Sequence, residues 1–479
     1  MSEQRRTQRQ TLIGGERIAP ESGEYRETVD PATGEVIGEA AVGSAADIDR
    51  AVETAREAFP DWRDTDAAER GRALHRVAEL VRDRADDLAR LETRDQGKPL
   101  SQARSDIEGA ARYFEYYAGA ADKLEGSSIP VGPDGVDYTV REPYGVSGQI
   151  VPWNFPANLL ARGVAPALAA GNTAVVKPAP TTPLSAFELA ELCHEAGIPA
   201  GAVNVVSGGG GTGGALTEHA GVDTLTFTGS VATGQRVMEA AAANITPVTL
   251  ELGGKNPAIV RSDADLETAV DAVETGIFVN AGQVCSAADR ALVHEDVYEE
   301  FLDRVVGRVE GMDVGPGLED PDVGPLNSAD HREKVSEYLA LGREEATVAA
   351  GGGTLEREGY FVQPTVLADV DPDDRVAQEE IFGPVLAVIP FGDDEDPVAI
   401  GNDTEYGLVA GVFTESLRQA HRDAKRLEAG NVYVNQWFGD RNRTPFGGYK
   451  HSGIGREKGR AALDSYLQTK NVAIDLGER

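Results

Sequence analysis

Hydrophobic positions in the first quarter of the chain recur at the spacing of amphipathic helices. Between residues 44 and 117, Ile48 and Val52 belong to one apolar stripe, and Leu74 and Val77 belong to another. Side chains three or four positions apart lie on the same face of a helix. This segment is therefore predicted to form helices that bury one face against a sheet or against one another.

The pattern changes between Val146 and Glu251, where short β-branched runs alternate with helix-like segments. The five runs end at Val151, Lys177, Val206, Phe227 and Glu251. A helix-like segment between them, Ser185–Gly197, ends on a glycine, as helices commonly do. Strands alternating with helices predict a doubly wound, mostly parallel sheet, and a ligand is expected at the carboxyl ends of its strands.

Two further regions follow a different pattern. Residues 124–144 are rich in Gly and Pro and include one alternating stretch, which predicts an exposed strand or arm. After Gly253 a strand is predicted at Ala258–Val260, followed by a helix that opens at Ser262 with Asp265 three residues on. The predicted fold class is α/β: a doubly wound parallel-sheet domain, a second α/β domain and a small β arm.

Composition narrows the class of partner. The 479 residues exceed the size at which a single core stops growing, so two large lobes are expected. The net charge of −35 would repel nucleic acid and anionic membranes. The acids are scattered over the helices, which is typical of a solvated surface. We hypothesise an adaptation to high salt, which screens self-repulsion; unchanged activity and melting temperature from low to molar salt would contradict it.

The two cysteines, Cys193 and Cys285, provide no disulfide framework, and this fits a reducing compartment. The polar N-terminus has no apolar stretch that would make a signal peptide, and the apolar runs are far shorter than a membrane span. A cytoplasmic protein is therefore expected, and no metal site is predicted. Cys193 lies on an apolar helix face with Leu189 and Leu192, as an inert core thiol would.

Cys285 has a context that suggests chemistry. A nucleophilic thiol needs a partner that accepts or relays a proton. Glu251 ends a strand just before Gly253 and Gly254, and a carboxylate at that place faces the ligand crevice, where partial desolvation makes it a general base. The alternative is a strand-end glutamate that is exposed to water.

Asn154 lies in the segment Pro152–Pro156, directly after the first strand of the parallel set. The two prolines fix the backbone around it, so its amide is a candidate donor to a developing oxyanion, together with the backbone N–H of Cys285. On its own this segment is equally compatible with a structural turn.

The three segments together show that the chain resembles the aldehyde dehydrogenase superfamily, from about Asp30 to Lys470. The motifs that carry the resemblance are PWNFP (152–156), VVKPA (175–179), FTGS (227–230), LELGGK (250–255), GQVC (282–285), EEIFGPV (379–385) and PFGGYKHSGIGRE (445–457). Seven motifs in order are far more specific than a single GQVC. The resemblance implies an NAD(P)-binding domain of residues 1–123 and 145–252, a catalytic domain of 253–459, and an oligomerisation arm of 124–144 and 460–479.

The resemblance also implies roles for individual residues. Cys285 would be the nucleophile, Glu251 the base that activates the hydrolytic water, and Asn154 the oxyanion donor. The residues implied at the cofactor are Trp153, Lys177, Ala179, Pro180, Gly213, Gly229, Ser230, Leu252, Glu380 and Phe382. The chemistry is thiol addition to an aldehyde, hydride transfer to the nicotinamide and hydrolysis of the resulting thioester.

The cofactor motif departs from the usual G-x-G-x-x-G. Gly229 and Gly234 have the spacing of its outer glycines, but Val231 replaces the middle one; they still open a helix whose N-terminus can face phosphate. The glycine run 207–214 lacks the Lys-Ser/Thr of a P-loop and predicts a tight strand-to-helix turn near the cofactor. Pro180 stands where relatives that prefer NAD often have a glutamate that would repel a 2′-phosphate. NADP is therefore expected to serve at least as well as NAD.

The expected substrate depends on a few side chains. Arg162 occupies the place where relatives resembling succinate-semialdehyde dehydrogenase grip a substrate carboxylate, and Arg441 and Arg443 would add positive charge at the mouth. A succinate or 2-oxoglutarate semialdehyde is therefore predicted. Two alternatives stay open: Arg162 is a surface residue paired with an acid, or Trp437, with Phe438 and Trp153, walls a pocket for neutral or aromatic aldehydes.

Three other classes of protein fit the sequence less well. A CoA-acylating relative typically lacks the glutamate base, whereas Glu251 is present. A non-catalytic protein has no reason to hold Cys285, Glu251 and Asn154 together, and a thiol hydrolase would need a histidine, which none of these motifs has beside it. The arm and the C-terminal TKNVAIDL resemble the strands through which the family assembles, so a homodimer or homotetramer is expected.

Overall fold

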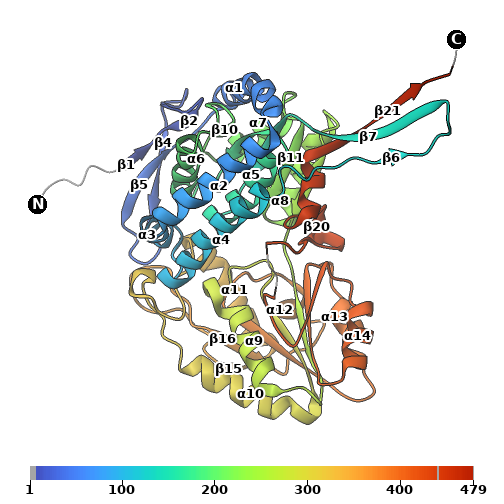
Figure 1. Cartoon of the computed structure of the whole chain (residues 1–479). Coiled ribbons are helices and arrows are strands. Elements are labelled where there is room, and N and C mark those ends of the chain that lie inside the picture. Colours follow the sequence, from blue (N-terminus) through green and yellow to red (C-terminus); the bar gives the residue numbers. More distant parts are fainter. Residues whose placement is uncertain (1–6, 440–441, 478–479) are drawn as a thin grey trace, which may run out of the picture.

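The computed structural model describes residues 7–439 and 442–477 and shows two α/β domains and a projecting arm (Figure 1). The first domain contains an eight-stranded sheet in the order β20-β12-β11-β8-β9-β10-β2-β3. Its parallel strands are β8 (Val146–Ile150), β9 (Thr173–Lys177), β10 (Val203–Val205), β11 (Thr224–Thr228) and β12 (Val248–Glu251). The predicted parallel set is confirmed. Three short antiparallel strands extend it, namely β2 (Thr11–Ile13), β3 (Glu16–Ile18) and β20 (Gly453–Ile454).

Helices cover both faces of this sheet. The bounds are α1 (Ala45–Asp64), α2 (Ala67–Asp83), α3 (Ala85–Gln96), α4 (Leu100–Ala118), α5 (Pro156–Ala169), α6 (Leu184–Glu195), α7 (Gly210–Glu218) and α8 (Val231–Ala242). α1, α7 and α8 pack on one face, where Ile48 and Val52 are buried, and α2 to α6 pack on the other with Leu74 and Val77. The predicted stripes are therefore the buried faces. Ser44 caps α1 in a capping box.

The second domain has a seven-stranded sheet in the order β15-β16-β17-β14-β13-β18-β19, parallel except for β15. The strands are β13 (Pro257–Val260), β14 (Arg290–His294), β15 (Thr347–Ala350), β16 (Thr365–Ala368), β17 (Val385–Phe391), β18 (Val409–Phe413) and β19 (Asn431–Val434). The helices are α9 (Leu266–Phe278), α10 (Glu295–Glu310), α11 (Ala329–Glu345), α12 (Arg375–Gln378), α13 (Pro397–Asn402) and α14 (Leu417–Arg426). The capping residue of α9 is Asp265, which accepts from the Glu267 N–H, and not Ser262 as predicted.

The arm is a three-stranded antiparallel sheet that projects from the body (Figure 1). Its strands are β6 (Ser128–Ile129), β7 (Gly135–Pro143) and β21 (Leu467–Asp475). The predicted C-terminal boundary of the arm differs from the structure, because Ala462, Leu463 and Tyr466 are buried in the core of the first domain. Likewise, β20 joins the first sheet although residues 453–459 were assigned to the second domain.

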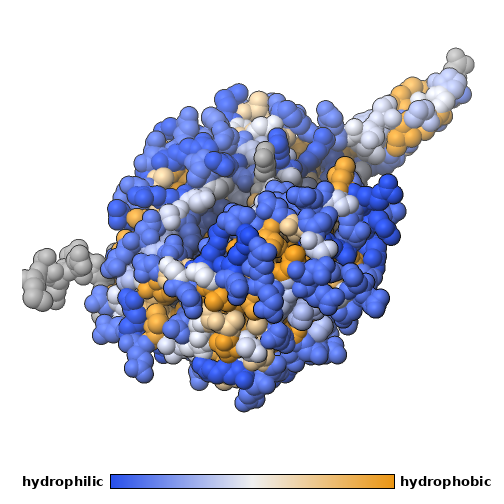
Figure 2. Space-filling view, turned by 90° about the horizontal axis from the view of Figure 1, so that it is seen from below, coloured by the Kyte–Doolittle hydropathy of each residue, from blue (hydrophilic) through white to orange (hydrophobic). Residues whose placement is uncertain are grey.

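A small sheet at the N-terminus was not predicted. It contains β1 (Thr7–Arg9), β4 (Tyr25–Val29) and β5 (Val36–Ala41). On the face shown in Figure 2 the surface is mostly hydrophilic, and hydrophobic residues gather along the arm. Among the described residues, no helix combines the length and the apolar character needed to cross a membrane. The adaptation to high salt stays a prediction.

Candidate active site

Cys285 lies on the loop between α9 and β14, and an unusual backbone turn delivers it there. Asn280, Ala281 and Gly282 have φ of 50°, 54° and 73°, so three successive residues adopt the left-handed conformation. A Cβ on Gly282 would lie 2.1 Å from the carbonyl oxygen of Gly383, so only glycine fits. α9 has already ended at Phe278, and the turn leads the chain to Cys285, which lines cavities at the carboxyl ends of the first sheet's strands.

Two cavities meet at Cys285. The first has a volume of about 230 Å³ and is lined by Pro152, Trp153, Asn154, Thr228, Gly229, Ser230, Leu252, Gly253, Cys285, His331, Lys334, Glu380 and Phe382. The second has a volume of about 400 Å³, and its lining includes Asn154, Arg162, Glu251 and Cys285. Both open at the carboxyl ends of β8, β11 and β12, where a ligand was predicted. A group bound at Cys285 is therefore reached from two sides.

As a residue Cys285 is partly exposed, whereas Cys193 is fully buried in α6. Burial raises the pKa of Cys285 to about 12, against the opposing attraction of Arg162. Burial likewise raises the pKa of Cys193 to about 12, and the position of Cys193 in the core is confirmed. Cys285 differs from Cys193 in access to a cavity, and both groups are thiols at neutral pH.

Glu251 ends β12 and lines the second cavity. Its residue exposure is 2 %, and neither carboxylate oxygen accepts a hydrogen bond within the described part of the chain. Burial and then repulsion from Glu457 raise its pKa well above the usual range, against the attraction of Arg162, whose Nη2 lies 3.8 Å from Oε2. The carboxylate is buried and not exposed to bulk water, so it is poised to take up a proton.

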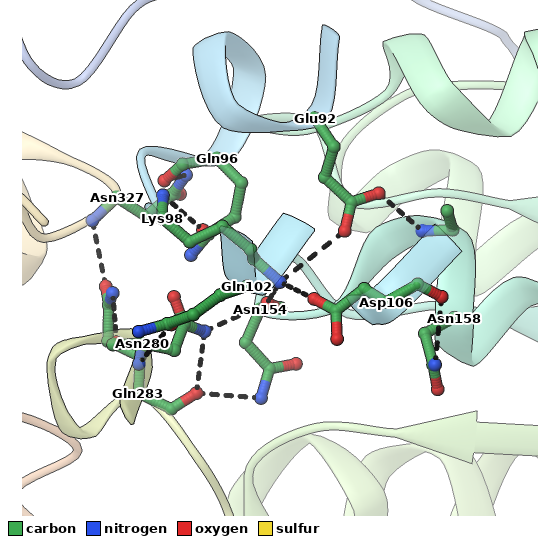
Figure 3. A network of polar contacts seen from close by, with 11 residues as sticks. Glu92, Gln96, Lys98, Gln102, Asp106, Asn154, Asn158, Asn280, Gln283 and Asn327 are labelled. Atoms are coloured by element: carbon green, nitrogen blue, oxygen red, sulfur yellow. Dashed lines mark hydrogen bonds and ion pairs between the residues drawn. The ribbon is translucent and has the colours of Figure 1, made fainter. Parts of the chain in front are cut away.

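Asn154 is held by its backbone and by its side chain (Figure 3). Its carbonyl oxygen accepts from Lys98 Nζ at 2.9 Å and from Asn280 Nδ2 at 3.0 Å. Its own Nδ2 donates to the carbonyl oxygen of Gln283 at 3.0 Å, which leaves one N–H of the amide for another acceptor. A fixed donor beside both cavities is what oxyanion stabilisation requires.

Six of the residues predicted at the cofactor line the first cavity together: Trp153, Gly229, Ser230, Leu252, Glu380 and Phe382. Ser230 directly precedes α8, so the positive end of that helix faces the cavity. Glu380 accepts from the Gly254 N–H at 3.0 Å, and burial raises its pKa to about 7. The cavity therefore brings together the N-terminus of α8, which attracts phosphate, the carboxyl group of Glu380 and the ring of Phe382.

The other four predicted cofactor residues are not in the lining of this cavity: three lie at or directly after the end of β9, and Gly213 lies on α7. Lys177 Nζ donates to the carbonyl oxygens of Pro178 and Gly208, and burial lowers its pKa to about 8. Gly213 packs against the Lys177 side chain, since a Cβ there would lie 3.5 Å from Cδ. Ala179 is buried and Pro180 is partly exposed, directly after β9.

Two residues of α11 were missed by the sequence analysis. His331 and Lys334 line the first cavity, although no motif surrounds them. Lys334 Nζ donates to the Glu380 carbonyl oxygen at 3.0 Å, and His331 Nε2 donates to the Phe382 carbonyl oxygen at 2.7 Å. Burial lowers the pKa of His331 to about 4, so it is neutral at physiological pH. A histidine therefore shares a cavity with Cys285, but its ring nitrogen is engaged elsewhere.

Arg162 is not a surface residue. It is buried on α5 and lines the second cavity, where it forms an ion pair with Glu457 and lies 4.6 Å over the ring of Phe446. The sequence analysis anticipated an acidic partner for Arg162, but on the surface. Glu457, 295 positions further along the chain, is that partner.

Of the other residues predicted at the substrate, Trp437 and Arg443 are not in the lining of either cavity. Trp437 packs in the core of the second domain and lines neither cavity. Its Nε1 donates to the Ser286 carbonyl oxygen at 2.9 Å and so holds the loop that contains Cys285. Its neighbour Phe438 lines the second cavity instead. Arg443 is exposed and outside both linings, and Arg441 lies outside the described residues.

The fold and the site define an oxidoreductase with a dinucleotide-binding domain and a cysteine at the domain junction. The family model described as "Aldehyde dehydrogenase family" matches residues 18–472, and the chain belongs to that family. It is 45% identical over 469 residues to a hydroxyisobutyraldehyde dehydrogenase of Mycolicibacterium austroafricanum, covering 97% of this chain and 93% of the relative. The chain is accordingly an NAD(P)-dependent aldehyde dehydrogenase.

Solved structures show the same likeness. An NAD⁺ complex of an aldehyde dehydrogenase from Bacillus cereus has a TM-score of 0.96 and 42% identity, covering 98% of this chain and 97% of the other. A betaine aldehyde dehydrogenase from Staphylococcus aureus in complex with NAD⁺ has a TM-score of 0.96 and 38% identity, with coverage of 98% and 97%. The predicted α/β architecture with cofactor and catalytic domains is confirmed by these matches.

Proposed function

We propose that the chain oxidises an aldehyde to a carboxylic acid through a thioester on Cys285. Asn154 and the backbone N–H of Cys285 stabilise the oxyanion, and Glu251 activates the water that hydrolyses the thioester. The observation that supports this most is the lining of the second cavity, which includes a cysteine, a fixed amide donor and a buried carboxylate without a hydrogen bond. Such a set suits acyl chemistry on sulfur.

Each residue has one step in this scheme. The thiol of Cys285 releases its proton to solvent as Sγ bonds to the aldehyde carbon, and the free N–H of Asn154 donates to the oxygen as negative charge develops there. Loss of the aldehyde hydrogen as hydride leaves an acyl group on Sγ. Glu251 then takes a proton from a water molecule, whose oxygen attacks the acyl carbon and releases the acid and the thiol.

The first cavity fits a nicotinamide dinucleotide. Gly229 and Ser230 at the N-terminus of α8 would hold the pyrophosphate, and Glu380 and Phe382 would hold the nicotinamide ribose and ring. When bound, the nicotinamide supplies the hydride acceptor. Hydrolysis rather than transfer to CoA is supported by Glu251, which a CoA-acylating enzyme would not need.

We propose a small uncharged aldehyde as the substrate, and not the carboxylated semialdehyde that Arg162 suggested. The guanidinium of Arg162 is already paired with Glu457 and lies beside Glu251. Docking a substrate carboxylate on it would compete with Glu457 for its charge inside a buried site, and leaving a buried acid unpaired costs about 3–5 kcal/mol. The name of the hydroxyisobutyraldehyde dehydrogenase relative is in accord with this choice.

A substrate panel tests this choice. For neutral aldehydes of three to five carbons, with and without a hydroxyl, we expect kcat/KM to exceed that for succinate semialdehyde by about tenfold or more, which is ~1.4 kcal/mol of discrimination. Initial rates of reduced-cofactor formation measure it. Arg162→Lys, which keeps the charge, is the matched variant for Arg162→Met. A preference for succinate semialdehyde that Arg162→Met abolishes by raising KM would restore the carboxylated substrate.

The cofactor preference follows from Pro180. No carboxylate stands at position 180 to repel a 2′-phosphate, so we propose that NADP serves at least as well as NAD. Introducing one by Pro180→Glu is expected to shift the ratio of kcat/KM for NADP to that for NAD by about tenfold toward NAD. Pro180→Gln, of similar shape without the charge, is the control. A ratio that strongly favours NAD in the unaltered enzyme would refute the proposal.

We also propose that the arm assembles a homo-oligomer. β21 pairs with β7 along nine residues and leaves its other edge without a strand partner in the described chain. Val136, Ile474 and Leu476 are exposed on the same arm. An open edge with exposed apolar side chains is a surface that proteins normally cover. A monomer in sedimentation at micromolar concentration would contradict this assembly.

A further inference from the structure

Lys98 is a fully buried lysine at the junction of the two domains (Figure 3). It lies between α3, which ends at the left-handed Gly97, and α4. Its side chain has no exposed surface, and its Nζ forms ion pairs with Asp106 and with Glu92, the latter at 3.5 Å. Burying an ammonium is unfavourable unless every N–H has a partner, so a lysine here needs an explanation beyond packing.

The third partner of Lys98 Nζ is the carbonyl oxygen of Asn154, at 2.9 Å. The ammonium also lies 4.1 Å from the ring centroid of Phe155, the next residue. Lys98 Nζ thus donates to Asp106 and to the Asn154 carbonyl oxygen, and Glu92 adds a second carboxylate at ion-pair distance. The cation fixes the peptide that follows Asn154.

The same peptide is held from the catalytic domain. Asn280 Nδ2 donates to the Asn154 carbonyl oxygen, and the Asn154 side chain donates to Gln283, two residues before Cys285. The counter-ion Glu92 accepts from the Ala157 N–H at 3.1 Å, in the first turn of α5. The segment that contains Asn154 is therefore clamped between the α3–α4 corner and the nucleophile loop.

We propose that Lys98 is a positioning residue that acts through Asn154. By fixing the Asn154 peptide, with Glu92 and Asp106 as counter-ions, it keeps the remaining N–H of the Asn154 amide aimed at the oxygen of a substrate on Cys285. The inference rests on the proposed role of Asn154 as oxyanion donor. Lys98 itself lines neither cavity.

A double-variant cycle with Asn154 tests the proposal. Removing one oxyanion donor costs about 10²–10³ in kcat, which is the expectation for Asn154→Ala. For Lys98→Met we expect a fall in kcat of about tenfold to a hundredfold with KM changed less than about threefold. In the Asn154→Ala background, Lys98→Met should have no further effect on kcat beyond about twofold, because the group it positions is gone.

Controls separate positioning from general damage. Lys123→Met removes an exposed lysine that pairs with Asp122 and should leave kcat unchanged. The cofactor dissociation constant, measured by fluorescence, should be the same in Lys98→Met as in the unaltered enzyme. If Lys98→Met does not fold, the cycle is run with Glu92→Gln and Asp106→Asn added, which leaves no unpaired buried carboxylate.

Two results would overturn the proposal: Lys98→Met within about twofold of the unaltered kcat, or losses that multiply in the double variant. A folded Asn154→Ala enzyme with full kcat would instead refute the role proposed for Asn154, whatever Lys98 does. The two failures are therefore distinguishable.

Discussion

Replacing Cys285 by alanine is expected to lower kcat for aldehyde oxidation by about 10⁴ or more, because no covalent intermediate can form. The measurement is the formation of reduced cofactor at saturating aldehyde. Binding should survive, since the first cavity keeps the other residues that line it. Cofactor affinity within about threefold of the unaltered enzyme would show that the loss lies in the chemistry.

Cys193→Ala is the matched control for this experiment. It removes the other thiol of the chain, which lies in the core away from both cavities. Its kcat should be unchanged, although deletion of a buried group costs some stability. Substantial oxidation by Cys285→Ala, with Cys193→Ala inactive, would place the nucleophile elsewhere.

The parallel strands were predictable because their sequences are locally distinctive. Buried runs such as Thr173–Lys177 are β-branched, and both faces of the sheet are covered, so the apolar pattern is continuous. The strands β4 and β20 were not predicted, each for a different reason. Tyr25–Val29 is largely exposed and polar, and Gly453–Ile454 is a strand only because β12 lies beside it.

Candidate site residues could be recognised from the sequence where they lie in short contiguous motifs, and could not where their contacts are long-range. Cys285, Glu251 and Asn154 were each found in a short segment with prolines or glycines around it. Lys98 gave no such signal, because its partner Asp106 follows on a helix and its partner Asn154 lies 56 positions away. A lysine in a polar segment is ordinarily expected in solvent.

The role of Arg162 also could not be predicted from the sequence, because it depends on a distant partner. Its position on an apolar helix was evident in the sequence, but its meaning depends on Glu457, which lies in another motif. Together with Glu251 these residues form a buried cluster of one cation and two acids. The buried charges of these three residues offset one another only while all three are present. Arg162 is therefore better placed to lower the pKa of Glu251 than to bind a substrate carboxylate.

Replacing Glu251 by glutamine should separate the two halves of the reaction. The side chain keeps its shape but cannot accept a proton, so hydrolysis of the thioester is expected to fall by about 10²–10⁴. Mixing enzyme, aldehyde and cofactor in a stopped-flow instrument should give a burst approaching one reduced cofactor per site, followed by very slow turnover. Hydroxylamine, which attacks a thioester without a base, should restore turnover.

The pH profile gives the second signature of Glu251. Its raised pKa means that the carboxyl is protonated, and unable to act as a base, at pH values where an ordinary glutamate is ionised. Activity of the unaltered enzyme should therefore fall as pH decreases, with a midpoint above 4.5, and Glu251→Gln should lose this acid limb. Arg162→Met should move the midpoint upward, because the attraction that opposes the shift is removed.

If Glu251→Gln shows neither a burst nor a trapped thioester, Glu251 acts before the thioester forms, and the water-activating role is wrong.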